Sequence, residues 1–246
     1  MHRRGFFCVL LMSLVTAFTA GPWPAAGQES NAAVENAIAV LEAGKVDEAI
    51  ELFSRLIESK PEGRLHFYRG FAYLMKGREQ AAIDDFSRAI ALEPDQPDYY
   101  HQRGIAYTRL IQYQAAAKDF STVVELDPDR SDAYARLAWA FFNDGQPDNA
   151  VRRLNQGIKM DAANAGYYRL RGDIFAAHGD YQQAVSDYNA AIELKKNDPI
   201  AYNNRGVALA NLGRNREAMA DISHAMELAS TNPRTTTTPG FSGNPW

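Results

Sequence analysis

The chain has 246 residues and a globular composition, with 46% hydrophobic and 23% charged residues. Its formal net charge of −4 excludes the strong basic excess typical of nucleic-acid-binding proteins, so no nucleic-acid partner is expected. Cys8 is the single cysteine, which excludes an intrachain disulfide and a cysteine-rich metal site.

The N-terminal segment has the pattern of a targeting signal. Two arginines precede an apolar stretch over residues 5–20, and small residues follow at Ala25-Ala26-Gly27. This order predicts a secretory signal peptide over residues 1–27, cleaved before Gln28, and therefore a secreted or periplasmic protein. The apolar stretch is shorter than the roughly 20 residues that a membrane-spanning helix needs. An uncleaved membrane anchor remains the alternative, and the protein would then contact a membrane only through this segment.

After the signal, a motif returns at a constant step along the chain. Pro94 is followed by Pro128, and Gly70 by Gly104, at the same spacing. A period in this range predicts stacked structural repeats rather than one irregular domain. The array is expected over residues 28–232, with six repeats at 30–62, 63–96, 97–130, 131–164, 165–198 and 199–232.

Each repeat has the pattern of two helices joined by a turn. Apolar residues recur at steps of three and four, as in Ala82, Ile83 and Phe86, which is typical of a helix face. The third repeat has Ile111 at the turn and is expected to make that turn in another way. The other turns have a glycine, which can adopt the left-handed conformation that ends a helix: Gly44, Gly77, Gly145, Gly179 and Gly213.

A second regularity pairs an arginine in the first helix with an aspartate in the second, at a constant spacing, in four of the six repeats. Both residues are absent from the first repeat, and in the fourth repeat Leu137 and Arg153 occupy their positions. This coupling predicts an ion pair between the two helices of each repeat, whereas the alternative is that the arginines bind an anionic ligand. The pairs are Arg69–Asp85, Arg103–Asp119, Arg171–Asp187 and Arg205–Asp221.

Small residues such as Gly104 and Ala116, and aromatic residues such as Tyr107 and Phe120, recur at matching positions of successive repeats. This pattern resembles the tetratricopeptide repeat, a helix–turn–helix unit whose length matches the observed period. The resemblance covers Ser30 to Asn232. It implies an all-α fold, an α-solenoid of such repeats that forms a right-handed superhelix with a concave groove. It also implies a non-catalytic binding scaffold whose first helices line that groove and whose partner is a protein or peptide.

The resemblance assigns groove positions residue by residue. Aromatic side chains ringed by polar groups are typical of peptide-binding hot spots, so Phe67, Phe71 and Trp139 are expected to face solvent, and so are His101 and Ile105. The alternative is that Trp139 and Phe142 are partly core. The assigned groove residues are Arg64, Phe67, Phe71, Met75, His101, Ile105, Arg109, Trp139, Phe142, Asn143, Arg169, Asn203, Asn204 and Asn211, with Ala135, Asp173 and Val207 beside them.

Some members of the family grip a C-terminal carboxylate with lysine, asparagine and arginine side chains from successive repeats. Arg169 and Asn204 match two of those positions, but Asp173 replaces an expected asparagine. Because an aspartate repels a carboxylate, this specialised function is not expected.

The sequence contains no constellation typical of catalysis. The histidines lack metal-ligand spacing, and the glycines are single and periodic rather than clustered around a phosphate. We therefore expect no cofactor, no metal and no enzymatic activity. The hypothesis is an adaptor that binds an extended peptide or partner protein, and the alternative is a membrane-anchored assembly subunit of an envelope complex. Residues 233–246, rich in Thr, Pro and Gly, predict a disordered tail or a short recognition motif ending at Trp246.

Overall fold

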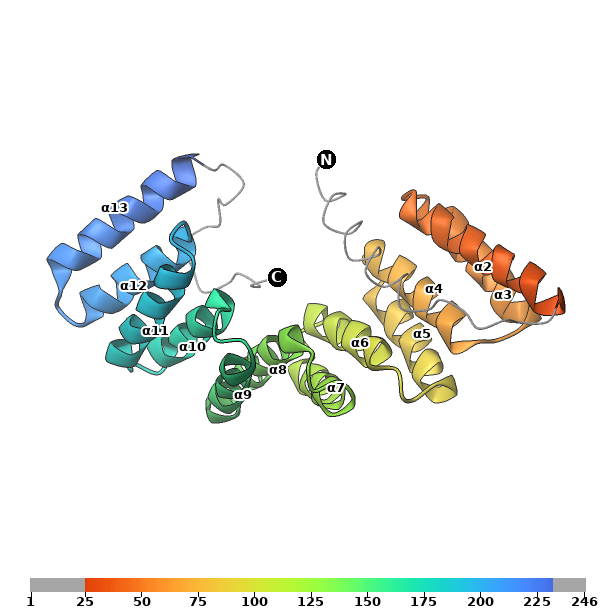
Figure 1. Ribbon diagram of the computed structural model, residues 1–246, viewed down its shortest axis with the longest axis horizontal. Coiled ribbons are helices and arrows are strands. Elements are labelled where there is room, and N and C mark those ends of the chain that lie inside the picture. Colours follow the sequence, from red (N-terminus) through yellow and green to blue (C-terminus); the bar gives the residue numbers. More distant parts are fainter. Residues whose placement is uncertain (1–24, 232–246) are drawn as a thin grey trace. The chain divides into compact units, whose positions relative to one another are not determined.

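The computed structural model describes residues 25–231, and within this range every regular element is an α-helix (Figure 1). The predicted all-α repeat fold is thereby confirmed. The signal peptide and the tail fall on residues outside the described range, apart from Ala25–Gly27, which open α2. The helices are α2 (Ala25–Glu42), α3 (Val46–Ser59), α4 (Gly63–Met75), α5 (Glu79–Leu92), α6 (Pro97–Arg109), α7 (Tyr113–Leu126), α8 (Ser131–Asn143), α9 (Pro147–Met160), α10 (Ala165–Ala177), α11 (Tyr181–Leu194), α12 (Pro199–Asn211) and α13 (Asn215–Thr231).

The chain separates into two compact units at Asp127 and Pro128. The N-terminal unit contains α2 to α7, and its core includes the fully buried side chains of Phe53 and Phe86. The C-terminal unit contains α8 to α13, with one apolar cluster around Tyr167 and another around Tyr188. Each unit is described by itself below.

Close approach of the two helices in a repeat explains the periodic glycine in the first helix. A Cβ atom added to Gly104 would lie 2.8 Å from the ring of Phe120, and one added to Gly172 would lie 2.8 Å from Tyr188. Such distances leave no room for a side chain. In the fourth repeat, which has Ala138 at this position, the crowded glycine is Gly157 in the second helix, 2.9 Å by the same measure from Tyr167 of the next repeat.

The turn of the third repeat corrects the expectation that it differs from the others. Ile111 has φ of 62°, in the same left-handed region as the turn glycines, where φ is 69° to 81°. Its hydrogen bonds are also the same: Gln112 N–H donates to the Tyr107 carbonyl at 2.9 Å, as Arg78 N–H does to Tyr73. The contacts of the helix pair therefore impose this turn on a β-branched residue that disfavours it.

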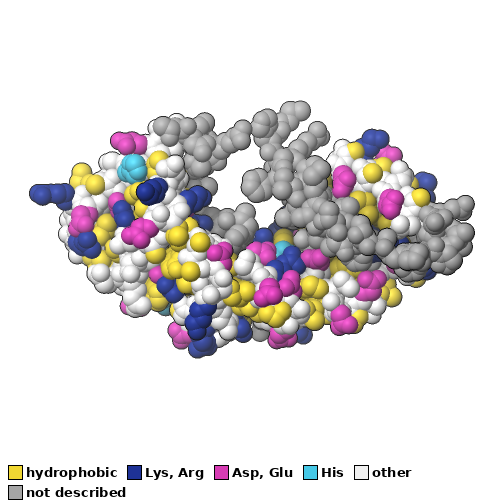
Figure 2. All heavy atoms as spheres, viewed as in Figure 1, with side chains coloured by type: hydrophobic (Ala, Val, Ile, Leu, Met, Phe, Trp, Pro, Cys, Tyr) yellow, Lys and Arg dark blue, Asp and Glu magenta, His cyan; other side chains and the backbone are white. Residues whose placement is uncertain are grey.

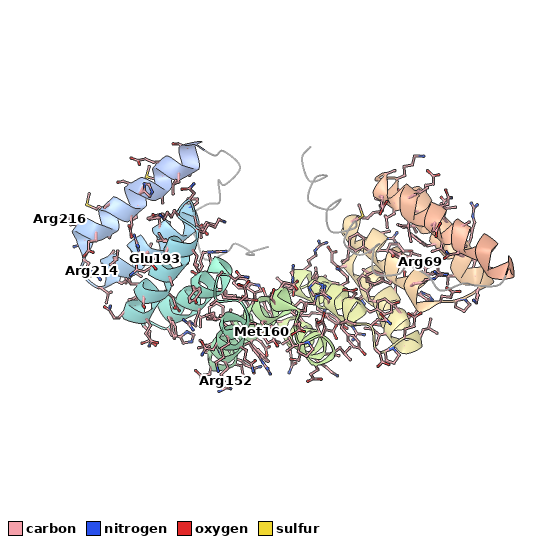
Figure 3. All side chains as sticks on the ribbon, in the orientation of Figure 1. Arg69, Arg152, Met160, Glu193, Arg214 and Arg216 are labelled. Atoms are coloured by element: carbon pink, nitrogen blue, oxygen red, sulfur yellow. The ribbon has the colours of Figure 1, made fainter. Side chains whose placement is uncertain are left out.

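The four predicted arginine–aspartate pairs are confirmed. In each repeat Nε and Nη2 of the arginine donate to the two carboxylate oxygens of its partner, as in Arg103–Asp119, where both distances are 2.8 Å. The remaining nitrogen, Nη1, donates to a side-chain oxygen on the second helix of the preceding repeat, which sequence reasoning missed. The acceptors are Ser54 for Arg69 (labelled in Figure 3), Ser87 for Arg103, Asn155 for Arg171 and Asn189 for Arg205.

Each arginine therefore joins three helices. It spans the two helices of its own repeat and reaches back to the repeat before it. The side chains of the arginines are only 15% to 20% exposed, and those of their aspartates 4% to 11%. This arrangement favours the structural role of the arginines over anion binding.

Replacing Ile111 by glycine should stabilise the protein by about 1 kcal/mol, because glycine adopts the left-handed conformation without steric strain. The Ile111 side chain is 71% exposed, so its loss removes little packing. The free energy of unfolding in urea measures the effect. The matched control is Gly77→Ile, which should destabilise the protein by a similar amount. If Ile111→Gly is less stable than the wild type, the backbone of Ile111 is not strained.

Replacing Asp85 by alanine should destabilise the protein by about 3 kcal/mol, because it strands the buried Arg69 guanidinium without its partner. Asp85 also lies 3.0 Å from Nδ1 of the buried His66. The control is Asp84→Ala, one residue earlier in the same helix, where the exposed carboxylate accepts a hydrogen bond from Gln80. Urea denaturation should show almost no change for this control, and equal effects of the two substitutions would contradict the pairing.

Candidate functional site

Within each unit, the first helices of successive repeats lie against each other. Helix α4 contacts α6 in the N-terminal unit, and α10 contacts both α8 and α12 in the C-terminal unit. We call the side chains that these helices contribute at the assigned groove positions the first-helix face. The predicted site residues all lie on these five helices.

In the N-terminal unit, the expectation that Phe67, Phe71 and His101 face solvent is wrong. Phe67 and Phe71 are 5% and 3% exposed and belong to the apolar core. The ring of Phe67 lies between Phe86 of α5 and Tyr99 of α6, with centroid distances of 5.8 and 5.0 Å. His101 is 3% exposed and packs edge to face against Phe120 at 5.8 Å.

The other site residues of the N-terminal unit are partly accessible. Met75 and Ile105 are half-buried, and Met75 packs against the core. Arg64 donates from Nε to Glu62 at 2.7 Å, and Arg109 donates to the Leu74 carbonyl at 3.0 Å. These arginines are already bonded within their own unit, so this unit offers a smaller free surface than expected.

In the C-terminal unit, α8 carries aromatic side chains that remain accessible. Trp139 and Phe142 are half-buried, and their ring centroids lie 6.3 Å apart. Both pack against the apolar cluster around Tyr167, so the alternative prediction that they are partly core is confirmed. The ring of the exposed His178 meets Phe142 edge to face at 6.3 Å. Asn143 is bonded locally, because its Nδ2 donates to the Trp139 carbonyl at 2.8 Å. We call Trp139, Phe142 and His178 the aromatic patch.

Next to α8, helix α10 contributes a polar group centred on Asp173. Oδ1 of Asp173 accepts two hydrogen bonds, one from the Tyr188 hydroxyl at 2.8 Å and one from Asn204 Nδ2 at 2.9 Å. Asn203 Nδ2 donates in turn to Asn204 Oδ1 at 3.2 Å. We call Asp173, Tyr188, Asn203 and Asn204 the Asp173 network. Of the remaining assigned residues, Ala135 is buried, whereas Val207 and Asn211 are exposed.

Burial governs the electrostatics of this network. It raises the pKa of the Asp173 carboxyl above its usual range, and the charge of Arg169 and the two hydrogen bonds only partly offset it. The Arg169 guanidinium lies closer to Asp198, with Nε 3.8 Å from Oδ2. Burial and the neighbouring Asp173 carboxylate likewise raise the pKa of the Tyr188 hydroxyl. The surroundings of Asp173 therefore disfavour the ionised form of its side chain.

Three further properties bear on the kind of site. Residues 25–231 contain no cluster of three or more His, Cys, Asp or Glu side chains that could hold a metal ion. No helix in the same range is long and apolar enough to span a membrane. Acidic and basic side chains are interspersed over the described surface visible in Figure 2.

Comparisons with known proteins agree with the helix pairs. Family models of the tetratricopeptide repeat match overlapping stretches at residues 34–97, 69–136, 112–174, 172–213 and 200–232. The chain is a tetratricopeptide repeat protein. Proteins of this family are generally protein-interaction scaffolds, and their repeat fold is typically non-catalytic.

Individual relatives share the fold over different lengths. The chain is 36% identical over 88 residues to the tetratricopeptide repeat and J domain-containing co-chaperone DNJ1 of Cryptococcus neoformans var. grubii, covering 35% of this chain and 16% of that protein. A tetratricopeptide repeat protein from Parabacteroides merdae superimposes with a TM-score of 0.72 and 18% identity, covering 81% of this chain and 80% of that one. YrrB, described as having an unusual peptide-binding site, has a TM-score of 0.59 and 18% identity, covering 74% and 94%.

Two members of the site were missed from sequence. Tyr188 was not assigned to the site, although its hydroxyl donates a hydrogen bond to Asp173. His178 is the C-terminal cap of α10 and was not assigned to the groove, yet its ring extends the aromatic patch. The sequence carried one usable signal, because Tyr188 is the only tyrosine at a position that Phe86 and Phe120 occupy in other repeats.

Replacing Asp173 by asparagine should stabilise the protein at neutral pH. The asparagine Oδ1 can accept both existing hydrogen bonds, and the buried charge disappears. Because the pKa of Asp173 is raised in the folded state, wild-type stability falls as pH rises from the unfolded-state pKa towards the folded-state pKa. The advantage of Asp173→Asn, measured by urea denaturation, should therefore be largest above the folded-state pKa and shrink as pH falls towards the unfolded-state pKa. A less stable variant at pH 7 would contradict this account.

Proposed function

We propose that this protein is a non-catalytic adaptor that binds an extended peptide segment of a partner protein on the first-helix face of its C-terminal unit. The accessible aromatic patch supports the proposal most strongly. Trp139 and Phe142 are half-buried, tryptophan is enriched in protein–protein hot spots, and phenylalanine is enriched in interfaces. Grouped apolar surface of this kind has a cost in water unless a partner covers it.

The polar surroundings of the patch support a peptide ligand in particular. Asp173, Asn203 and Asn204 lie on the next two first helices, α10 and α12, and the Tyr188 hydroxyl joins them from the second helix α11. Carboxylate and amide groups therefore lie on the helices that follow α8. A peptide backbone needs such donors and acceptors when it leaves water. The structurally similar YrrB is described by its peptide-binding site, which is compatible with this use of the fold.

The partner is expected outside the cytoplasm. The N-terminal pattern over residues 1–27 supports export, and the proposal is a secreted or periplasmic adaptor cleaved before Gln28. N-terminal sequencing of the protein from its native host decides between the two N-terminal hypotheses. A start at Gln28 supports the cleaved form, whereas an intact N-terminus would favour the membrane-anchored assembly subunit.

The binding surface can be tested with peptides. A phage-displayed library of random dodecapeptides is selected on the full chain, and an enriched peptide is synthesised for fluorescence polarisation. Phe142→Ala and Trp139→Ala should each weaken its binding about 30-fold, the ratio that corresponds to a hot spot of about 2 kcal/mol.

The control is Leu194→Ala, which removes a 44% exposed apolar side chain from the end of the second helix α11. Its affinity should match that of the wild type. Circular dichroism confirms that each variant is folded, and Phe142→Leu serves as a milder variant if Phe142→Ala is not. The proposal fails if no peptide is enriched, or if the aromatic variants bind as well as the control.

A further inference from the structure

One position of the first-helix face breaks an otherwise apolar row. Counting by repeats, Asp173 is equivalent to Trp139 in the preceding repeat and Val207 in the following one. The equivalent residues of the N-terminal unit are Phe71 and Ile105. From the second repeat to the sixth, Asp173 is therefore the one polar residue at this position.

The carboxylate of Asp173 accepts hydrogen bonds but forms no ion pair with a described residue. Its Oδ1 atom accepts both hydrogen bonds of the network, from Tyr188 and Asn204, and both donors are uncharged. Among the described residues, no lysine, arginine or histidine forms an ion pair with it. Arg169, the cation whose charge acts on Asp173, makes its ion pair with Asp198, the residue that caps α12.

This arrangement leaves Oδ2 for a group from outside. A half-buried carboxylate that forms no ion pair is costly, and an added cation removes most of that cost. An anionic ligand would increase the cost, because it would place a second negative charge beside Asp173. The two neutral donors fix the direction of the carboxylate, so the site is preorganised for a cationic hydrogen-bond donor.

The neighbouring residues suit a long basic side chain. Trp139 lies on α8, which packs directly against α10, and Val207 lies on α12 on the other side. Lysine and arginine stems pack along apolar surface while their charged heads reach a polar group. An aromatic ring near the head adds a cation–π attraction.

We infer that the Asp173 network is a specificity pocket for a lysine or arginine side chain of the bound peptide. This inference rests on the proposed peptide-binding function and names the chemistry that the peptide must carry. The amide groups of Asn203 and Asn204 then bond the peptide backbone or the remaining donors of the cation. Peptides with an acidic residue at the same place are rejected.

Binding of the cation should depend on pH. A bound cation lowers the pKa of Asp173 relative to the free protein, so affinity is full at high pH and falls as Asp173 takes up a proton. The groups that face Asp173 are Arg169 on its own helix, Tyr188 from α11, and Asn204 and Asp198 from α12 and its cap. Asp198 is a second carboxylate in this group. The pH profile of an Asp173 variant is therefore needed to assign the pH dependence to Asp173.

The test uses the peptides enriched on the full-length wild-type chain. These peptides should contain a basic residue at one enriched position, and a parallel selection on Asp173→Asn should lose that preference. In fluorescence polarisation, replacing the lysine of the peptide by norleucine should weaken binding to the wild type at least tenfold. The same replacement should leave binding to Asp173→Asn almost unchanged, and replacement by glutamate should favour Asp173→Asn over the wild type.

The matched control is Glu193→Gln, which removes one exposed negative charge from the second helix of the same repeat (Figure 3). Binding to this variant should weaken as much as binding to the wild type when the lysine of the peptide is replaced by norleucine. Its affinity should also depend on pH in the same way as that of the wild type. The inference is overturned if the enriched peptides lack a basic residue, or if the norleucine peptide loses as much affinity on Asp173→Asn as on the wild type. In both cases peptide binding itself stands, whereas a failure to enrich any peptide overturns the proposed function as well.

Discussion

In the second, third and fifth repeats, the close contact between a glycine in the first helix and an aromatic ring in the second is the constraint on which the packing depends. At Gly104 and Phe120 the available space is smaller than one methyl group needs. This contact sets the distance between the helices of the repeat, and the distance decides which other side chains can meet. The arginine–aspartate pair spans the same two helices, and its geometry requires the spacing that the glycine permits.

The polar links and the apolar contacts have different roles in this fold. A buried ion pair adds little net stability compared with apolar residues of similar size, and the fourth repeat has the fully buried Leu137 at the arginine position. The pairs matter because the arginine and the aspartate occur together: where Leu137 replaces the arginine, Arg153 replaces the aspartate. They therefore favour one alignment of helices over alternatives that bury the same apolar area, and specificity of packing is their contribution.

Much of the fold could be predicted from sequence because the patterns that indicate it arise from contacts within one repeat. The constant repeat period, the turn glycines and the coupled arginine and aspartate positions all identify local contacts, and the structure has them. The site was harder to predict because exposure depends on neighbouring repeats. Phe67 and His101 occupy groove positions by count, yet large neighbours such as Tyr99 and Phe120 bury them. The Ile111 turn was misjudged for a related reason, since tertiary contacts override the preference of a single residue.

The third bond of each arginine limits how repeats can be exchanged. In the N-terminal unit its acceptor is a serine, Ser54 or Ser87, and in the C-terminal unit it is an asparagine, Asn155 or Asn189. The asparagine oxygen is one bond farther from the backbone than the serine oxygen, so the two kinds of acceptor reach different distances from their helix. A recombined array that places a repeat from one unit behind a repeat of the other would combine an arginine with an acceptor of the wrong reach. The repeats are thus modular in outline but specific to their neighbours, and engineered arrays built from them should move repeats together with the second helix that precedes them.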